Sequence, residues 1–183
     1  MEIKALIQAL RRQDAAAQRT MLTQYGQVVY SCVSRIVARR EDAEEVYQDV
    51  FVKAFQGIDS YDEQQASLIT WLCRIAYNES LNFVRRHKLS LVYSEESSYD
   101  LNNQQDELSD ADDEPPNEQK IQLMEAAMEL LPREEQAILS MYYYEGLSLK
   151  EIAFITNSNP STVGSKLCRI RRRLYSIIKS QIR

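Results

Sequence analysis

Apolar residues recur every three or four positions along most of the first 88 residues, which is the period of amphipathic helices. This pattern predicts four helices, over residues 3–10, 21–37, 42–55 and 67–88. The third is predicted to begin with a capping box, because Asp42 and Glu45 lie three positions apart. The polar stretch 56–66 is predicted to be irregular.

The same spacing returns after residue 118, together with signals for where helices end. Pro132 is expected to end one helix and Gly146 the next. Ser148 and Glu151 have the spacing of a capping box for a short helix that is expected to end near Thr156.

Three residues then predict a turn and a new helix. Asn157 suits the left-handed turn position, Asn159 an N-cap and Pro160 the first helical turn. The buried stripe of this last helix is predicted to be Val163, Leu167, Ile170, Leu174 and Ile177. Its outer face would carry Ser161, Thr162, Ser165, Lys166, Arg169, Arg172 and Arg173.

A short helix, a three-residue turn and a longer helix with a polar, basic outer face predict a helix-turn-helix. Hydroxyl groups at the start of the second helix can reach base edges, and its arginines can pair with phosphates. The alternative is a basic helix that is only solvated surface.

Charge divides the chain into three parts. Residues 1–88 carry 12 basic and 11 acidic side chains, and residues 119–183 carry 10 basic and 6 acidic. Residues 89–118 carry 10 acidic side chains and none that is basic. Such a segment, with few apolar residues, is expected to be a flexible linker. The fold class predicted is therefore all-α, with two small helical domains (1–88 and 119–183) joined by an acidic linker.

Other features limit the classes of protein to which this chain can belong. The 3 cysteines are far apart in the sequence and His87 is the single histidine, so a zinc site is not expected, and the thiols are expected to be reduced. No segment has the length and apolarity of a membrane span, and the N-terminus lacks the pattern of a secretory signal, so a soluble, cytoplasmic protein is expected.

Two surfaces in the first domain have candidate functions. Glu44, Glu45 and Asp49 form an acidic patch on the third predicted helix. On the fourth, Asn78, Asn82, Arg85 and Arg86 share one side, and these residue types can read bases or phosphates. The alternative is that both are ordinary solvated helix faces.

Four segments resemble one family. Residues 42–55 read DAEEVYQDVFVKAF, 70–78 read TWLCRIAYN, 131–136 read LPREEQ and 144–153 read YEGLSLKEIA. In this order they are similar to bacterial RNA polymerase sigma factors of the extracytoplasmic-function group. The resemblance implies a promoter-specificity subunit that is not itself an enzyme, needs no cofactor, binds core RNA polymerase and promoter DNA, and is a monomer when free. It also suggests an anti-sigma partner.

The resemblance also implies roles for individual residues. The first segment would grip the polymerase through Asp42, Glu45, Gln48, Asp49 and Lys53. Residues 59–67 would capture a base flipped from the minus-ten strand, at a cost of a few kcal/mol of stacking. Contact with the minus-ten element is assigned to Tyr61, Ser67, Thr70, Trp71, Arg74, Tyr77, Asn78, Asn82, Arg85 and Arg86. The helix-turn-helix would read the minus-thirty-five element with the outer face given above.

The chain departs from the family pattern at a few positions. Leu68 and Ile69 stand where an aromatic and a basic residue often precede the Thr-Trp pair, and Gly164 stands where a lysine is common. These changes affect details of DNA contact rather than the assignment.

Two other classes of function remain open at this point. An ordinary helix-turn-helix activator or repressor would need neither a polymerase-docking helix nor a strand-opening segment. A hydrolase or transferase using the carboxylates of residues 41–49 lacks a phosphate-binding loop, a histidine partner and paired metal ligands. One further hypothesis is that the acidic linker folds back on the basic recognition helix in the free protein.

Overall fold

The computed structural model describes residues 3–91 and 118–181, and within them every regular element is helical. The first group comprises α1 (Ile3–Arg11), α2 (Ala15–Ser34), α3 (Arg40–Gly57), the 3-10 helix η1 (Ile58–Ser60) and α4 (Leu68–Leu91). The second comprises α5 (Glu118–Glu129), α6 (Arg133–Tyr143), α7 (Leu149–Ile155) and α8 (Pro160–Gln181). The all-α prediction is confirmed. Nearly all of the predicted linker, residues 92–117, lies outside the described residues.

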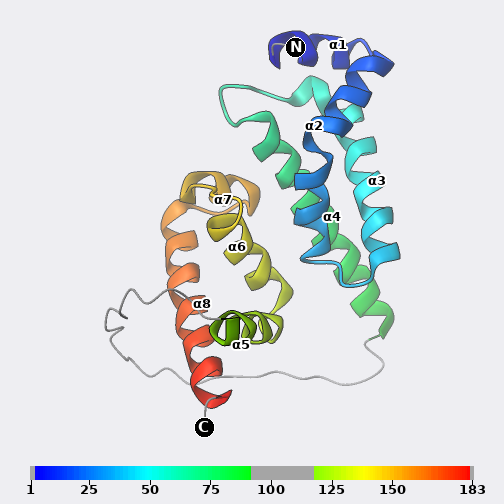
Figure 1. Ribbon diagram of the computed structural model, residues 1–183. Coiled ribbons are helices and arrows are strands. Elements are labelled where there is room, and N and C mark those ends of the chain that lie inside the picture. The colour runs from blue at the N-terminus through cyan, green and yellow to red at the C-terminus, as the bar shows by residue number, and fades with distance from the viewer. Residues whose placement is uncertain (1–2, 92–117, 182–183) are drawn as a thin grey trace.

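Helices α2, α3 and α4 pack side by side and bury one apolar face each (Figure 1). Met21 and Val29 of α2, Val50 of α3 and Leu72 of α4 are all completely buried. Helix α1 lies across one end of this bundle and adds Leu10 to the same core. Complete burial of such a side chain contributes about 1.5–3 kcal/mol, so this core fixes the relative positions of the candidate surfaces on α3 and α4.

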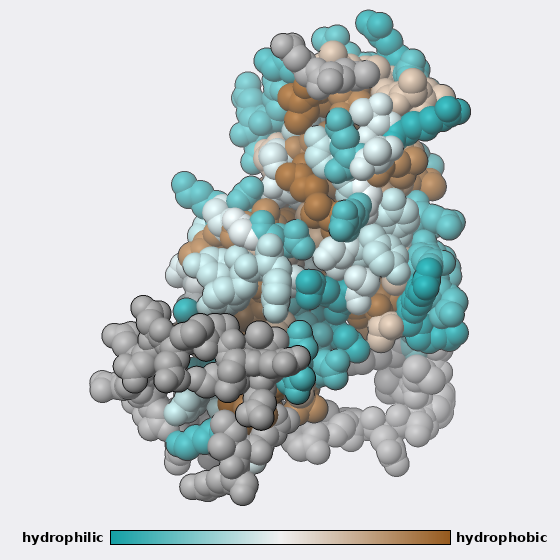
Figure 2. Space-filling view, viewed as in Figure 1, coloured by the Kyte–Doolittle hydropathy of each residue, from teal (hydrophilic) through white to brown (hydrophobic). Residues whose placement is uncertain are grey.

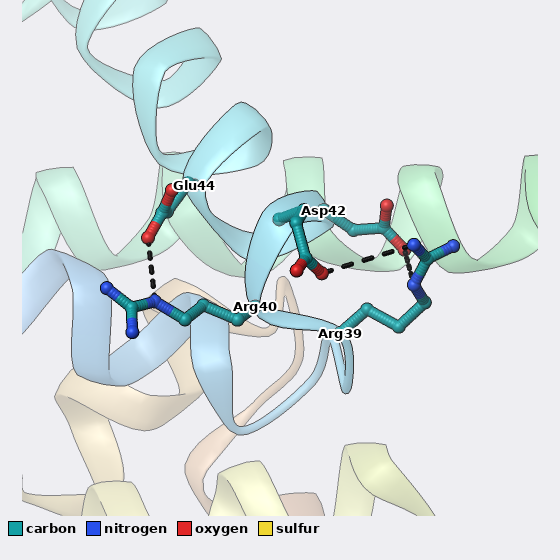
Figure 3. Close-up of polar contacts among 5 residues, drawn as sticks. Arg39, Arg40, Asp42 and Glu44 are labelled. Atoms are coloured by element: carbon teal, nitrogen blue, oxygen red, sulfur yellow. Dashed lines mark hydrogen bonds and ion pairs between the residues drawn. The ribbon is translucent and has the colours of Figure 1, made fainter.

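The start of α3 differs from the prediction. The helix begins at Arg40, two residues before Asp42, and its N-cap residue Arg39 makes no side-chain capping bond. Asp42 instead lies in the first turn with its carboxylate 3.9 Å from Arg39, so the predicted Asp42–Glu45 capping box is wrong (Figure 3). The reason is electrostatic. A carboxylate in the first turn interacts favourably with the positive end of the helix dipole even when it makes no capping hydrogen bond.

The stretch predicted to be irregular is partly helical. Helix α3 continues to Gly57, and η1 then adds one 3-10 turn that buries Ile58. Ile58 is an apolar side chain in an otherwise polar stretch, and its burial in the core explains why a turn of helix packs here.

The end signals in the second group are confirmed. Gly146 has φ of 64° after α6, and Asn157 has φ of 51° in the turn after α7. Ser148 and Glu151 form both bonds of the capping box. Asn159 Oδ1 accepts a hydrogen bond from the Thr162 amide at 2.7 Å, as expected of an N-cap.

On the face drawn in Figure 2, hydrophobic residues form separate patches among hydrophilic ones. Within residues 3–91 and 118–181, no helix combines the length and apolarity needed to cross a bilayer.

Candidate nucleic-acid interface

Helices α7 and α8 form the predicted helix-turn-helix. Four members of the predicted stripe of α8, Val163, Leu167, Ile170 and Leu174, are buried, which turns the opposite side of the helix outward. The fifth, Ile177, is only half-buried. The residues of the predicted outer face that are exposed are Ser161, Thr162, Ser165, Arg169 and Arg172. Hydroxyl groups therefore stand at the start of the helix and guanidinium groups further along it, which suits bases and phosphates respectively.

Two members of the predicted outer face are engaged within the protein. Lys166 Nζ lies 3.3 Å from Glu134, and Arg173 Nη1 donates to Glu135 at 2.8 Å. Both acids belong to the first turn of α6, and both basic side chains are half-buried. In this structure these two side chains brace α8 against α6 rather than face solvent.

Arg171 and Lys150 are exposed basic residues that sequence reasoning did not select. Arg171 directly follows buried Ile170, so a strict division into an inner and an outer face omitted it. The last 23 residues hold 7 Lys or Arg and no acidic residue, and this excess of positive charge was the available signal for Arg171.

The residues predicted for the minus-ten element fall into three groups. The first group is exposed, mostly along α4: Ser67, Asn78, Asn82, Arg85 and Arg86. Asn78, Asn82, Arg85 and Arg86 repeat at three- and four-residue intervals, so they line one face of the helix. Their amide and guanidinium groups can donate to bases and phosphates.

The second group closes the loop before α4. Tyr61 is buried, and its hydroxyl donates to the Ala66 carbonyl at 3.1 Å. Trp71 meets its ring edge-on at a centroid distance of 5.5 Å, and Arg11 donates to the Tyr61 carbonyl at 3.2 Å. Burial raises the pKa of the Tyr61 phenol. These contacts hold the loop in place. Tyr61 therefore stabilises the loop, and its ring is not free to contact a base.

The third group, Thr70, Arg74 and Tyr77, is covered by the C-terminal helices. The Thr70 hydroxyl is completely buried and donates to Glu151 Oε1 of α7 at 3.2 Å. The Arg74 guanidinium lies over the Phe154 ring at 4.5 Å. Tyr77 is buried, and burial followed by the neighbouring Glu134 carboxylate raises its phenol pKa.

Further contacts join α2 to the segment after α6. Ser31 Oγ donates to Glu145 at 3.3 Å, and the Arg35 guanidinium lies 5.0 Å from the centre of the Tyr144 ring. Ile36, Cys73 and Tyr77 share one apolar cluster with residues of α6, α7 and α8. We call this seating of the C-terminal helices on α2 and α4 the closed arrangement.

Glu151 links the capping box to the closed arrangement. Its carboxylate accepts bonds from the Ser148 amide at 2.9 Å and the Ser148 hydroxyl at 2.8 Å, besides the bond from Thr70. These bonds, with the Ser148 amide contributing most, lower the pKa of Glu151. The same side chain therefore stabilises the start of α7 and its contact with α4.

The candidate docking face lies on α3. Glu45, Gln48 and Asp49 are exposed, Asp42 is half-buried beside Arg39, and Lys53 forms an ion pair with Glu79 of α4 at 2.5 Å. At the start of the helix Arg40 also pairs with Glu44 at 2.9 Å (Figure 3). The predicted acidic patch is therefore present on the surface of α3. In the first turn of the helix, arginines partly neutralise the acidic charge.

Metal ligation finds no support in the described part of the chain, where no three or more His, Cys, Asp or Glu residues are gathered around one point.

Comparison with known proteins places both groups of helices. The model of sigma-70 region 2 matches residues 21–89, and the model of sigma-70 region 4 matches residues 121–174. Together they take in more than half of the chain, in the order that the sequence resemblance requires. The chain belongs to the sigma-70 family.

Relatives place it within the extracytoplasmic-function (ECF) group of that family. The ECF RNA polymerase sigma-E factor of Escherichia coli strain K12 is 29% identical over 185 residues, covering 98% of this chain and 96% of that protein. The protein of the same name from Haemophilus influenzae is 26% identical and covers 96% of this chain and 95% of its own length. The family resemblance seen in the sequence is thereby confirmed.

Solved structures show the same fold. The sigma factor RpoE of Bartonella quintana, in complex with the anti-sigma factor NepR, matches with a TM-score of 0.64 at 20% identity, covering 88% of this chain and 96% of that chain. CnrH, in complex with the cytosolic domain of CnrY, matches with a TM-score of 0.64 at 16% identity, covering 96% of each chain.

Proposed function

We propose that this protein is an RNA polymerase sigma factor that binds core polymerase and directs promoter-specific initiation. The observation that carries this function is the presence of regions 2 and 4 in one chain and in that order. An ordinary helix-turn-helix regulator would need only the second. We infer that the protein acts by binding rather than by catalysis, as a monomer when free, in the cytoplasm where polymerase and chromosome are found.

The proposed minus-thirty-five contact is made by α8. Ser161, Thr162 and Ser165 stand at the exposed start of the helix, where they can approach base edges. Arg169 and Arg172 follow on the exposed side of the helix, where their guanidinium groups can pair with phosphates. Lys166 and Arg173 join them only if they leave Glu134 and Glu135.

The proposed minus-ten contact is made by α4 and the loop before it. The exposed face with Asn78, Asn82 and Arg86 is available in the closed arrangement, whereas Thr70, Arg74 and Tyr77 are not. We infer that the C-terminal helices must leave α4 before the single strand can occupy that part of the surface. The closed arrangement is then the form of the free protein, and polymerase stabilises the open one.

The proposed polymerase contact is the exposed face of α3 with Glu45, Gln48 and Asp49. Helix α3 lies on the side of the bundle away from the C-terminal helices (Figure 1). Polymerase could therefore dock here before the closed arrangement opens.

An anti-sigma partner is proposed by analogy alone. The structures of RpoE with NepR and of CnrH with CnrY show that proteins of this fold can be held in complexes with other chains. A partner that bound both groups of helices here would prolong the closed arrangement.

Run-off transcription with purified bacterial core polymerase tests the function. Genome fragments serve as templates, and core binding is measured separately by gel filtration. The test variant is Asp49→Arg, and the matched control is Glu125→Arg, an equal change of charge at an exposed position of α5.

The proposal expects new transcripts with shared upstream elements, loss of core binding in Asp49→Arg and no loss in Glu125→Arg. Equal binding by both variants would remove the docking role from α3. Binding of duplex DNA without binding of core would contradict the sigma function itself.

A further inference from the structure

Cys32 of α2 and Cys73 of α4 lie side by side although 41 positions separate them in the sequence. Their sulfur atoms are 3.4 Å apart, with the Cys32 thiol donating to Cys73. Both are free thiols. A disulfide needs a separation of about 2.05 Å, so the two sulfurs would have to approach each other by about 1.4 Å to be joined.

The two sulfurs differ in their surroundings. Cys73 is 1% exposed, and its hydrogen bonding with Cys32, then burial, raise the pKa of its thiol. Cys32 is only half-buried, which makes it the more accessible of the two. An attacking thiol should be reachable and a resolving thiol should lie beside it, so Cys32 suits the first step and Cys73 the second.

A small cavity adjoins both sulfurs. Its volume is about 10 Å³, close to the space of one water molecule, and Arg35 and Ser140 also line it. Arg35 Nε and Ser140 Oγ are buried, and neither has a hydrogen-bond partner among the described residues. Two unsatisfied polar atoms beside the thiol pair give a water-sized polar molecule a place to bind.

We propose that Cys32 and Cys73 form an oxidisable dithiol that hydrogen peroxide converts into an intramolecular disulfide between α2 and α4. The Cys32 thiolate attacks one peroxide oxygen, the O–O bond breaks, and the leaving oxygen takes a proton to form water. The Cys73 sulfur then attacks the sulfur of the Cys32 sulfenic acid and expels its oxygen as water, using the Cys73 proton. Two thiols are oxidised by two electrons, and one peroxide is reduced.

Cys168 of α8 provides an internal control. It is half-buried like Cys32, but among the described residues no hydrogen bond joins its sulfur to another thiol. It is expected to remain a thiol at peroxide concentrations that close the Cys32–Cys73 bridge.

The experiment uses the full chain, reduced and then treated with hydrogen peroxide. Remaining thiols are blocked with iodoacetamide in denaturant, and the protein is digested with trypsin without reduction. Cleavage after Arg19, Arg35, Lys53 and Arg74 places Cys32 in the peptide 20–35 and Cys73 in the peptide 54–74. The intact protein is weighed in parallel to count the alkyl groups it carries.

We expect one alkyl group on the treated wild-type chain, three on the reduced chain and a dithiothreitol-sensitive link between peptides 20–35 and 54–74. The variant Cys168→Ser should keep the link, and Cys32→Ser should lose it. Bridges that contain Cys168 should be at least tenfold rarer. Three alkyl groups after treatment, or oxidation of Cys32 and Cys73 to separate sulfinic acids without a link, would overturn the proposal. Because the main readout uses the wild-type chain, it does not depend on how any variant folds.

Discussion

The hydroxyl of Thr70 donates a hydrogen bond to the carboxylate of Glu151 at 3.2 Å, across 81 positions of sequence. One of these residues lies at the start of α4 and the other in the capping box of α7. A residue that the family resemblance assigns to promoter opening is thus bonded to the helix-turn-helix in this structure.

Replacing Thr70 by valine should loosen the closed arrangement. Valine matches threonine in shape but cannot donate to Glu151, and a net hydrogen bond to a charged group contributes about 1.5–3 kcal/mol. Hydrogen exchange should therefore become faster by about tenfold to 150-fold at amides near Cys73 and Phe154. Thr23→Val is the matched control, because that hydroxyl bonds only to Arg19 of its own helix. Equal exchange in both variants would show that the bond contributes nothing to closure.

Acid should weaken the same contact. The folded protein lowers the Glu151 pKa below its ordinary value of 4.5, so the carboxylate's contribution to stability is complete above that pH. It is lost as the pH falls through the lower, folded-state pKa. The urea midpoint of the wild-type protein should exceed that of Glu151→Gln at pH 6, and the two should converge by about pH 3. A difference that stays constant with pH would mean that ionisation of Glu151 is not the cause.

Adjacent arginines of α8 should give different phenotypes. Arg172 is exposed and available for phosphate, so Arg172→Ala should weaken binding of a duplex. The slope of log affinity against log salt should fall by about 0.9 for that lost contact. Arg173→Ala removes the bond to Glu135, so it should lower the unfolding midpoint and change the salt slope less. Fluorescence anisotropy across a salt series and thermal unfolding measure the two effects, and identical behaviour of the variants would contradict the assignment.

Two glycines should respond in opposite ways to alanine. Gly146 has φ of 64°, a conformation that costs an L-residue roughly 1–2 kcal/mol, so Gly146→Ala should destabilise the protein by about that amount. Gly164 lies inside α8, where an added Cβ would meet Leu149 at 3.8 Å, an ordinary contact distance. Gly164→Ala should stabilise by about 0.5–1 kcal/mol. Chemical denaturation distinguishes these signs directly, and a stabilising Gly146→Ala would refute the turn argument.

The local signals in the sequence were sufficient to predict the helix-turn-helix. Gly146, Ser148, Asn157 and Asn159 each act within about four residues of chain, so their conformations follow from their own chemistry. The capping box at Asp42 was wrong because a second arrangement was available to the same residue. Arg39 lies three positions before it and offered a partner that propensity alone does not weigh.

What the sequence could not supply was the meeting of distant segments. Nothing in the spacing around Thr70, Arg74 or Tyr77 indicates that α7 covers them. The helical pattern also did not indicate that Lys166 and Arg173 pair with α6. Such a pattern predicts on which side of a helix a residue lies, but not which residues of other helices it contacts. The separation of Cys32 and Cys73 in the sequence concealed their contact in the same way.

The apolar cluster that Ile36, Cys73 and Tyr77 share with α6 and α8 has a consequence for dissecting the protein. A fragment ending after α4 would present these side chains to water, and a fragment beginning at α5 would present their counterparts, among them Ile138 and Met141. Each fragment prepared alone would therefore be prone to self-association. A full chain nicked by protease between residues 91 and 118 should still elute from gel filtration as one particle.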